Sequence, residues 1–265
     1  MTSPVLLQDL QLLENAAKKA GSLAMKWFGD STKNQKAKVW DKGNNHPVTE
    51  ADLAVDKLLT TTLRKARPDY GWLSEESKDD GSRLRAERVF VIDPIDGTRA
   101  FIKGKPHFSI SLAIVENGRP IAGAVYNPAL NEMYLAAKGQ GATANGKAIN
   151  VRKCEVLLNC SMIASDGLFR QKYWRTKWPA MNCESRNSMA YRIALVAAGK
   201  FDATLTLRPK SDWDLAAADL IAEEAGAIIT DTNGQIFHYN LQSTSKIGVI
   251  CAGKTVHDLI LHRII

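Results

Sequence analysis

Two aspartates, Asp93 and Asp96, lie three residues apart directly after the apolar run of residues 89–92. A proline between them fixes the backbone φ, and Gly97 then frees the backbone before the hydroxyl of Thr98. Carboxylate oxygens are the ligands that hard divalent cations prefer, and backbone N–H groups in such a turn can face an anion. The segment is therefore typical of a site for a divalent cation and a phosphate, although Asp-Pro and Asp-Gly also occur in plain turns.

Three further segments carry carboxylates that could join this turn. Glu75 and Glu76 follow a short apolar pair, and Asp52 and Asp214 each lie at the predicted start of a helix. Mg²⁺ takes oxygen ligands and keeps several waters, so a few carboxylates from separate segments suffice to hold it. The last two acids also have a purely structural explanation. Asp52 fits a capping box that begins at Thr49, and the charge of Asp214 would be stabilised by its own helix dipole.

The order and the residues of these segments resemble one known family. Residues 93–98, Asp-Pro-Ile-Asp-Gly-Thr, resemble the signature of the inositol monophosphatase family of Mg²⁺-dependent, Li⁺-sensitive phosphatases, and in particular its bacterial SuhB-like members. Residues 47–52, 73–77 and 211–218 resemble three other motifs of that family and occur in the family order. The likeness runs from about residue 12 to residue 253, which is nearly the whole chain.

The resemblance implies both a fold and an activity. The family fold is of the α+β class, a layered α-β-α-β-α sandwich, and we expect a single catalytic domain over residues 1–265 with two intimate lobes at about 1–150 and 151–265. The implied reaction is hydrolysis of a small polyol phosphate, most simply inositol monophosphate, by a metal-activated water, with two or three Mg²⁺ ions as cofactors. The implied metal ligands are Glu75, Asp93, the Ile95 carbonyl, Asp96 and Asp214.

The same resemblance assigns the catalytic residues Asp52, Glu75 and Thr98. The Thr98 hydroxyl would orient the attacking water, and Asp52 would accept a hydrogen bond from that hydroxyl. Glu75 would also hold a third, weaker ion, whereas Glu76 is expected outside the ligand set because the family uses the first glutamate of the pair. A capping box alone would explain Asp52 equally well, so both interpretations of this residue stay open.

The segments that would face the organic part of the substrate depart from the inositol-specific pattern. Residues 99–101, 186–191 and 207–210 differ from it, and Arg208 and Lys210 favour an anionic or bisphosphorylated substrate. A 3′(2′),5′-bisphosphate nucleotidase or a histidinol-phosphatase is therefore the alternative to an inositol-1-monophosphatase. The residues that we expect to bind the substrate are Asp93, Gly97, Thr98, Arg186, Tyr191, Arg208 and Asp214.

The composition of the chain limits its class and its partners. Hydrophobic residues make up 45% of the 265 residues, and no apolar run approaches the roughly 20 residues that span a bilayer. No secretory signal is visible, so we expect a cytoplasmic protein, and the resemblance implies a homodimer. The net charge of +7 and the basic, aromatic stretch of residues 170–186 also fit a second class, an RNA- or protein-binding regulatory factor of the SuhB kind. A packed helix face explains that stretch more simply.

Hydrophobic periodicity predicts the elements that must position these residues. Amphipathic helices are expected over residues 5–28 and from residue 49 to residue 67, where Pro68 stops the second one. An antiparallel meander of three strands is expected after the aspartate turn. Its strands are residues 108–115, 120–126 and 132–136. The second half is expected to alternate strands at 161–164, 201–207, 227–230 and 247–251 with helices at 168–177, 188–199, 214–225 and from 255.

Overall fold

A computed structural model describes residues 4–29, 37–41, 43, 47–165, 167–170 and 174–264. The described helices are α1 (Pro4–Ala24), α2 (Glu50–Ala66), α3 (Thr98–Ile102), α4 (Met189–Ala197), α5 (Asp212–Glu224) and α6 (Lys254–Leu261), with two 3₁₀ turns at Ser82–Arg85 and Leu168–Arg170. The first nine strands are β1 (Val39–Asp41), β2 (Pro47–Thr49), β3 (Gly71–Ser74), β4 (Arg88–Asp96), β5 (Ser109–Glu116), β6 (Arg119–Asn127), β7 (Glu132–Ala137), β8 (Ala142–Ala144) and β9 (Lys147–Ile149). The others are β10 (Ser161–Ile163), β11 (Asn182–Glu184), β12 (Ala203–Thr206), β13 (Lys210–Ser211), β14 (Ile228–Thr230), β15 (Ser245–Lys246) and β16 (Val249–Ala252).

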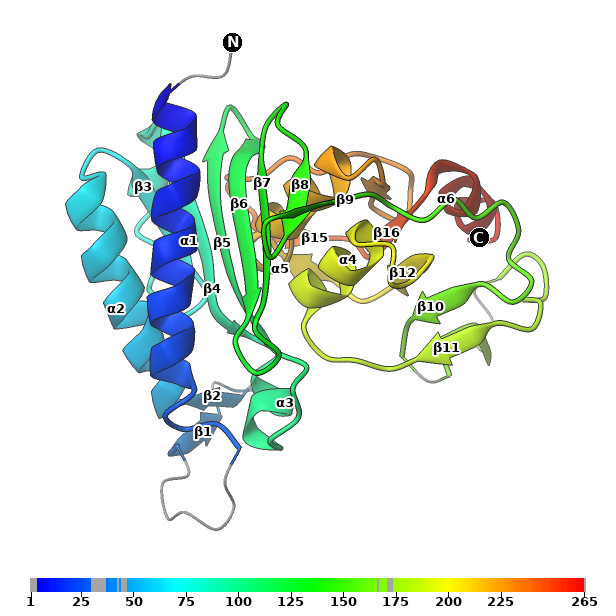
Figure 1. Cartoon of the computed structure of the whole chain (residues 1–265), viewed down its shortest axis with the longest axis horizontal. Helices are drawn as coiled ribbons and strands as arrows, with labels where there is room; N and C mark the ends of the chain where they lie inside the picture. The colour runs from blue at the N-terminus through cyan, green and yellow to red at the C-terminus, as the bar shows by residue number, and fades with distance from the viewer. Residues whose placement is uncertain are drawn as a thin grey trace.

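These elements form five layers (Figure 1). Helices α1 and α2 cover one face of a seven-stranded sheet in the order β3-β4-β5-β6-β7-β8-β9. Helices α4 and α5 lie between that sheet and a five-stranded sheet in the order β11-β10-β12-β16-β14, and α6 packs on the far side of the second sheet. The predicted α-β-α-β-α sandwich of the α+β class is therefore confirmed.

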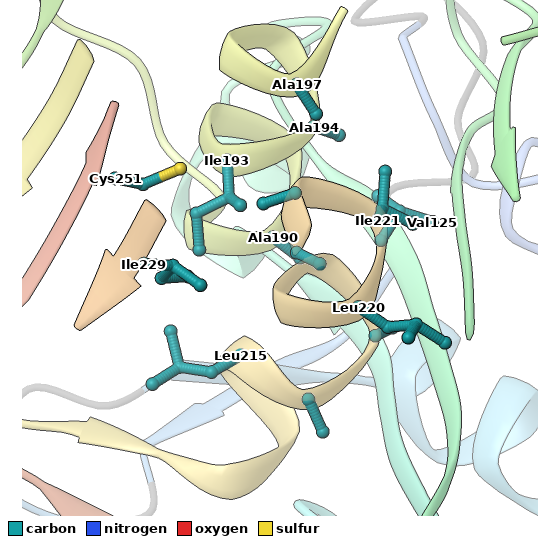
Figure 2. Close-up of a cluster of buried hydrophobic side chains, with 14 of the residues drawn as sticks. Val125, Ala190, Ile193, Ala194, Ala197, Leu215, Leu220, Ile221, Ile229 and Cys251 are labelled. Carbon is teal, nitrogen blue, oxygen red and sulfur yellow. The ribbon is translucent and has the colours of Figure 1, made fainter. Parts of the chain in front are cut away.

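The middle layer holds the two sheets together (Figure 2). Ala190, Ala194 and Ala197 of α4 are fully buried, and their small side chains let α4 pack closely against α5. Val125 of the first sheet and Cys251 of the second sheet belong to the same apolar cluster. Because an apolar cluster of this kind resists local rearrangement, the first turns of both helices are held rigidly against the end of β4.

Strand β4 carries the two aspartates of the signature at its end. It pairs in parallel with β3 and antiparallel with β5, and Asp93 lies opposite Ser111. The register then shifts between Asp93 and Asp96, where a proline interrupts the ladder. An irregularity of this kind changes the direction of side chains at a strand end. The apolar run of residues 89–92 predicts a strand that ends at residue 92, whereas in the structure pairing continues to Asp96.

The remaining predictions are confirmed with few exceptions. The helices at 5–28, 49–67, 188–199, 214–225 and from 255, and the strands of the meander, all occur with shifts of a few residues. The helix predicted over 168–177 is wrong: Leu168–Arg170 is a 3₁₀ turn, Trp174 bridges to Ile264, and residues 171–173 lie outside the described part of the chain. The short strands β1, β2, β8, β9, β11, β13 and β15 were not predicted. Across the residues described here, every helix is too short or too polar to cross a bilayer.

Candidate active site

Three aspartates from distant segments meet at one point of the fold. Asp93 and Asp96 come from the end of β4, and Asp214 comes from the first turn of α5. One carboxylate oxygen of each lies within 4.8 Å of the others. Together with Glu75, which follows β3, they line an open cleft of about 1090 Å³. Convergent carboxylates at this spacing are a donor set that suits a hard divalent cation.

Asp214 reaches the cleft because of a capping box that the sequence interpretation missed. Helix α5 begins at Asp212 rather than at residue 214, so Asp214 occupies the N3 position and Ser211 the N-cap. The backbone N–H of Ser211 donates to Asp214 Oδ2 at 2.8 Å, which fixes the side chain and leaves Oδ1 toward Lys210 Nζ at 3.7 Å. Capping and a place in the cleft are therefore compatible in one carboxylate.

Asp52 combines the same two features at the start of α2. Its Oδ2 accepts the backbone N–H and the hydroxyl of Thr49, which completes the predicted capping box. Its Oδ1 is 3.2 Å from the Thr98 hydroxyl, which is also 3.2 Å from the Ile95 carbonyl. Burial raises the pKa of Asp52 above its ordinary value, although the bonds from Thr49 and Thr98 oppose that rise. A helix cap alone therefore does not account for all the contacts of Asp52.

Asp96 is held by the beginning of α4. The Ser188 hydroxyl and the Ala190 backbone N–H both donate to Asp96 Oδ2 at 2.7 Å. Ser188 is the N-cap of α4 and has a φ of 62°, so its hydroxyl can also accept the Tyr191 N–H. Gly97 allows this close approach, because a Cβ there would lie 3.1 Å from the Ser188 nitrogen. The end of β4 and the N-terminus of α4 are therefore fixed to each other at the cleft.

The carboxylates of the cleft repel one another. Burial is the main cause that raises the pKa of Asp93 well above its ordinary value, and the charges of Glu75, Asp96 and Asp214 add to it. Burial and the charge of Asp214 raise the pKa of Asp96 to about 7. Buried like charges are unfavourable unless a cation compensates them, so the electrostatics of the site agree with its donor set.

Most residues predicted for the site lie in this cleft, but three do not line it. The cleft is lined by Glu75, Asp93, Asp96, Gly97, Thr98, Arg186, Arg208 and Asp214. Asp52 and Ile95 lie behind Thr98 and contact it. Tyr191 is 1% exposed, and its hydroxyl donates to Glu132 Oε2 at 2.7 Å, so its position does not agree with direct contact to a substrate.

Two residues of the cleft were missed from the sequence. Ser188, which anchors Asp96, and Arg192 both line it. Arg192 lies in α4, where most other residues are buried and apolar. A single arginine in such a helix was the available signal, because charged side chains rarely occupy buried helices without a partner.

Comparisons with known proteins agree with this fold. A model of the inositol monophosphatase family matches residues 6–264. The chain is 33% identical over 237 residues to the Nus factor SuhB of Escherichia coli K12, covering 85% of each chain. It is 38% identical over 193 residues to a fructose-1,6-bisphosphatase/inositol-1-monophosphatase of Thermotoga maritima, covering 71% of this chain and 72% of that one. The structure of the SuhB protein from Bartonella henselae superposes with a TM-score of 0.82 at 27% identity, covering 96% of this chain and 97% of that one.

The fold and the matches define a class of Mg²⁺-dependent phosphomonoesterases. This chain belongs to the inositol monophosphatase family.

The raised pKa values lead to a prediction about stability. A carboxyl group whose pKa is higher in the folded state stabilises the fold at low pH, and that stability is lost as the pH rises through the folded pKa. For Asp96 the pKa moves from 3.8 to about 7 on folding. We therefore expect the Tm of the protein in EDTA to fall as the pH rises from about 4 to about 7, and the gain in Tm on adding Mg²⁺ to grow over the same range.

Thermal denaturation at several pH values, in EDTA and in Mg²⁺, checks this expectation. The Asp96→Asn variant is the control, because it lacks the titrating group and should show a weaker pH dependence of the gain. A gain in Tm that is the same at every pH would contradict the idea that protons and cations compete for these carboxylates.

Proposed function

We propose that the protein is a Mg²⁺-dependent phosphomonoesterase that hydrolyses a small polyol phosphate, with inositol monophosphate as the first substrate to test. The observation that carries the proposal is the convergence of Asp93, Asp96 and Asp214 on one open cleft. The activities named for two relatives support it, since one is an inositol-1-monophosphatase from Rhizobium meliloti and another is a fructose-1,6-bisphosphatase/inositol-1-monophosphatase.

The residues that would hold Mg²⁺ are Glu75, Asp93, Asp96 and Asp214, which line the cleft, together with the Ile95 carbonyl, which lies 3.2 Å from the Thr98 hydroxyl next to them. Bound there, Mg²⁺ would supply charge neutralisation for the phosphate and a lowered pKa for the attacking water. The contacts of Asp96 suit this role, because its Oδ2 is already occupied by two donors and its Oδ1 is left for a ligand. Ser188 and Ala190 would not bind the metal themselves, but their hydrogen bonds orient the Asp96 carboxylate, as neighbouring groups commonly do for the ligands of metal sites.

Thr98 and Asp52 would position the attacking water. The single proton of the Thr98 hydroxyl can go to Asp52 Oδ1 or to the Ile95 carbonyl, which are both 3.2 Å away. With that proton donated, the Thr98 oxygen is left as an acceptor for a water O–H. The backbone N–H groups of Gly97 and Thr98 lie at the turn that would face the phosphate.

The cleft draws on both halves of the chain. Asp93 and Thr98 come from the first half, and Arg186, Arg208 and Asp214 come from the second. We therefore include in the proposal that residues 1–265 act as one catalytic unit of two intimate lobes.

Arg186 and Arg208 complete the proposed substrate contacts. Arg186 is steadied by Glu184 at 2.8 Å and by the ring of Phe201 at 5.1 Å.

A screen of phosphate release tests the proposal and its alternatives together. The panel contains inositol monophosphates, a nucleoside 3′,5′-bisphosphate and histidinol phosphate, each assayed with Mg²⁺ and with EDTA. We expect Mg²⁺-dependent release from the inositol monophosphates. Exclusive release from the nucleotide or from histidinol phosphate would instead support the bisphosphate nucleotidase or the histidinol-phosphatase.

Lithium is expected to inhibit the activity, and so is a large excess of Mg²⁺. Asp93, Asp96 and Asp214 form a small oxygen site, and Li⁺ can occupy such a site while carrying too little charge to support the reaction. Activity should therefore fall in tens of millimolar Li⁺, an order-of-magnitude choice for a weakly held monovalent ion, at fixed Mg²⁺. The same concentration of Na⁺ is the control. Equal activity in the two salts would contradict the assignment of these three aspartates to one cation site.

A second candidate function is that of an RNA- or protein-binding factor, which the name of the Escherichia coli relative favours. The basic stretch of residues 170–186 gives RNA binding little support. The rings of Phe169, Trp174 and Trp178 pack against one another with centroids 4.8–6.4 Å apart, so their faces are not free to stack on bases. RNA binding in Mg²⁺-free buffer with a steep dependence on salt would favour this second function. The homodimer stays a prediction from the family resemblance.

A further inference from the structure

Arg192 of α4 brings a guanidinium group into the cleft. Its Nε donates to the Thr204 hydroxyl at 3.0 Å. Its Nη2 donates to two backbone carbonyls, at 2.6 Å to Ile163 and at 3.0 Å to Leu205. The guanidinium is thus fixed against the ends of β10 and β12 by three hydrogen bonds. A group held in this way loses little further conformational entropy when it binds a ligand.

Within the part of the chain that the structure describes, Arg192 forms no direct ion pair, and the charge that acts on it is that of the Asp96 carboxylate in the same cleft. No carboxylate lies within 4.0 Å of it, and its Nη1 amino group makes no hydrogen bond to any described residue. Burial lowers the pKa of the guanidinium to about 10, so it remains charged at neutral pH. The side chain is partly exposed at the cleft, where Asp96 only partly compensates the charge of the guanidinium, so an anion that entered the cleft would add to that compensation.

Two other arginines of the chain are paired with acids instead. Arg119 pairs with Asp219 and Glu223, and Arg83, which is buried, pairs with Asp79. Arg192 is paired only with neutral oxygens, and the two N–H groups of its Nη1 are the donors that remain on the guanidinium. Arg208, an exposed residue that follows β12, lines the same cleft.

We propose that Arg192, assisted by Arg208, forms a subsite for a second oxyanion of the substrate, separate from the phosphate that is hydrolysed. This inference rests on the proposed phosphomonoesterase function and narrows its substrate class. A guanidinium binds carboxylate and phosphate oxygens by the same charge-assisted hydrogen bonds, so the second oxyanion is a phosphate or a carboxylate.

The lining of the cleft indicates what carries the two anions. Among the described residues of the lining, Trp213 is the single aromatic side chain, and serines, carboxylates and basic side chains predominate. A nucleobase would gain little stacking in such a cleft, whereas the hydroxyls of a polyol would find many partners. The substrate class is therefore a small polyol phosphate that bears a second phosphate or a carboxylate.

Two matched pairs of substrates test the subsite. Fructose 1,6-bisphosphate and fructose 1-phosphate differ by a second phosphate, and 3-phosphoglycerate and glycerol 3-phosphate differ by a carboxylate. We expect wild-type kcat/KM to favour the member with a second oxyanion group in at least one pair, and the pair that responds identifies the oxyanion. In Arg192→Gln that preference should fall by about 10- to 100-fold, the range for a lost charge-assisted hydrogen bond, with fructose 1-phosphate and glycerol 3-phosphate little affected.

Three further variants separate binding from folding. Arg83→Gln removes a buried arginine that does not line the cleft, so it should lower the Tm and leave the preference unchanged. Arg192→Lys keeps the positive charge but lacks the planar set of donors of the guanidinium, so it should retain more of the preference than Arg192→Gln does. Arg208→Ala alters an exposed residue, so it keeps the test available even if Arg192→Gln does not fold. An unchanged preference in folded Arg192→Gln, or in both Arg192→Lys and Arg208→Ala, would overturn the proposal and leave Arg192 as a clamp between β10 and β12.

The outcome also distinguishes this inference from the proposed function. Mg²⁺-dependent hydrolysis of inositol monophosphate, without any preference for the substrates that carry a second oxyanion, would support the proposed function and overturn the subsite. If no phosphomonoester were hydrolysed, the proposed function would fail, and calorimetric Kd values for the same pairs would still decide whether Arg192 selects a second oxyanion.

Discussion

Replacement of Asp93 by asparagine should lower kcat by about 10³-fold or more while leaving the fold intact, because electrostatic stabilisation of a charged transition state is commonly the largest catalytic contribution. Asp93 lies between the carboxylates that raise its pKa, so it is placed to share a cation with its neighbours. The amide has nearly the same shape but lacks the charge. The loss should therefore appear in kcat at saturating Mg²⁺, and the Tm in EDTA should be equal to or above that of the wild type.

Asp219→Asn is the matched control for this experiment. Asp219 is an equally buried aspartate, but its carboxylate faces Arg119 and Tyr239 away from the cleft. Its replacement should change the Tm and leave kcat within a few fold of the wild type. An Asp93→Asn enzyme with near-wild-type kcat would end the proposed mechanism, whatever the behaviour of the control.

Replacement of Thr98 by alanine is expected to have the second largest effect, a loss of about 10²-fold in kcat with little change in KM or Tm. Positioned groups that help to move a proton in a reaction contribute on the order of 10²–10⁴-fold. The Thr98 hydroxyl can donate its proton to Asp52 or to the Ile95 carbonyl, so its oxygen is fixed in position as an acceptor for the attacking water. Steady-state kinetics of Thr98→Ala and Thr98→Ser measure the effect, and the serine variant should recover most of the activity.

Asp52 should behave differently from Thr98, since it both caps α2 and binds Thr98. Asp52→Ala should lower both kcat and the Tm, the latter because loss of a cap costs about 1 kcal/mol. Thr49→Ala disturbs the same cap without touching Thr98, so its effect should be confined to the Tm. If Asp52→Ala reduced only the Tm, Asp52 would be a helix cap and nothing more.

The sequence was sufficient where local patterns determine the structure. Hydrophobic periodicity located α1 and α2, and the Thr49 capping box with Pro68 set both ends of α2. Alternating apolar strands with short polar turns located the meander from β5 to β7. The carboxylates of the cleft were found because their motifs resemble those of a known family. The local pattern alone left Asp52 and Asp214 open between a cap and a functional residue. In the structure each completes a capping box, while Asp214 also lines the cleft and Asp52 also contacts Thr98, which lines it.

Contacts between distant segments could not be predicted in this way. Asp96 is held by Ser188 and Ala190, which are 92 and 94 residues further along the chain. The position of the Arg192 guanidinium in the cleft also depends on distant segments, because it donates to the Ile163 carbonyl of β10 and the Leu205 carbonyl of β12. The wrong helix over 168–177 has a similar cause. Trp174 pairs with Ile264 near the end of the chain and packs on Trp178, so tertiary contacts outweigh local propensity there.

Phosphate release from inositol monophosphate, measured as a function of Mg²⁺ concentration with the wild-type protein, tests the central claim most directly. The three convergent aspartates predict a saturable rise in rate with Mg²⁺, return to background in EDTA, and recovery when Mg²⁺ is restored. A folded protein that released no phosphate above background at any Mg²⁺ concentration, from this or any other phosphomonoester of the panel, would contradict the claim that this cleft is a phosphatase active site.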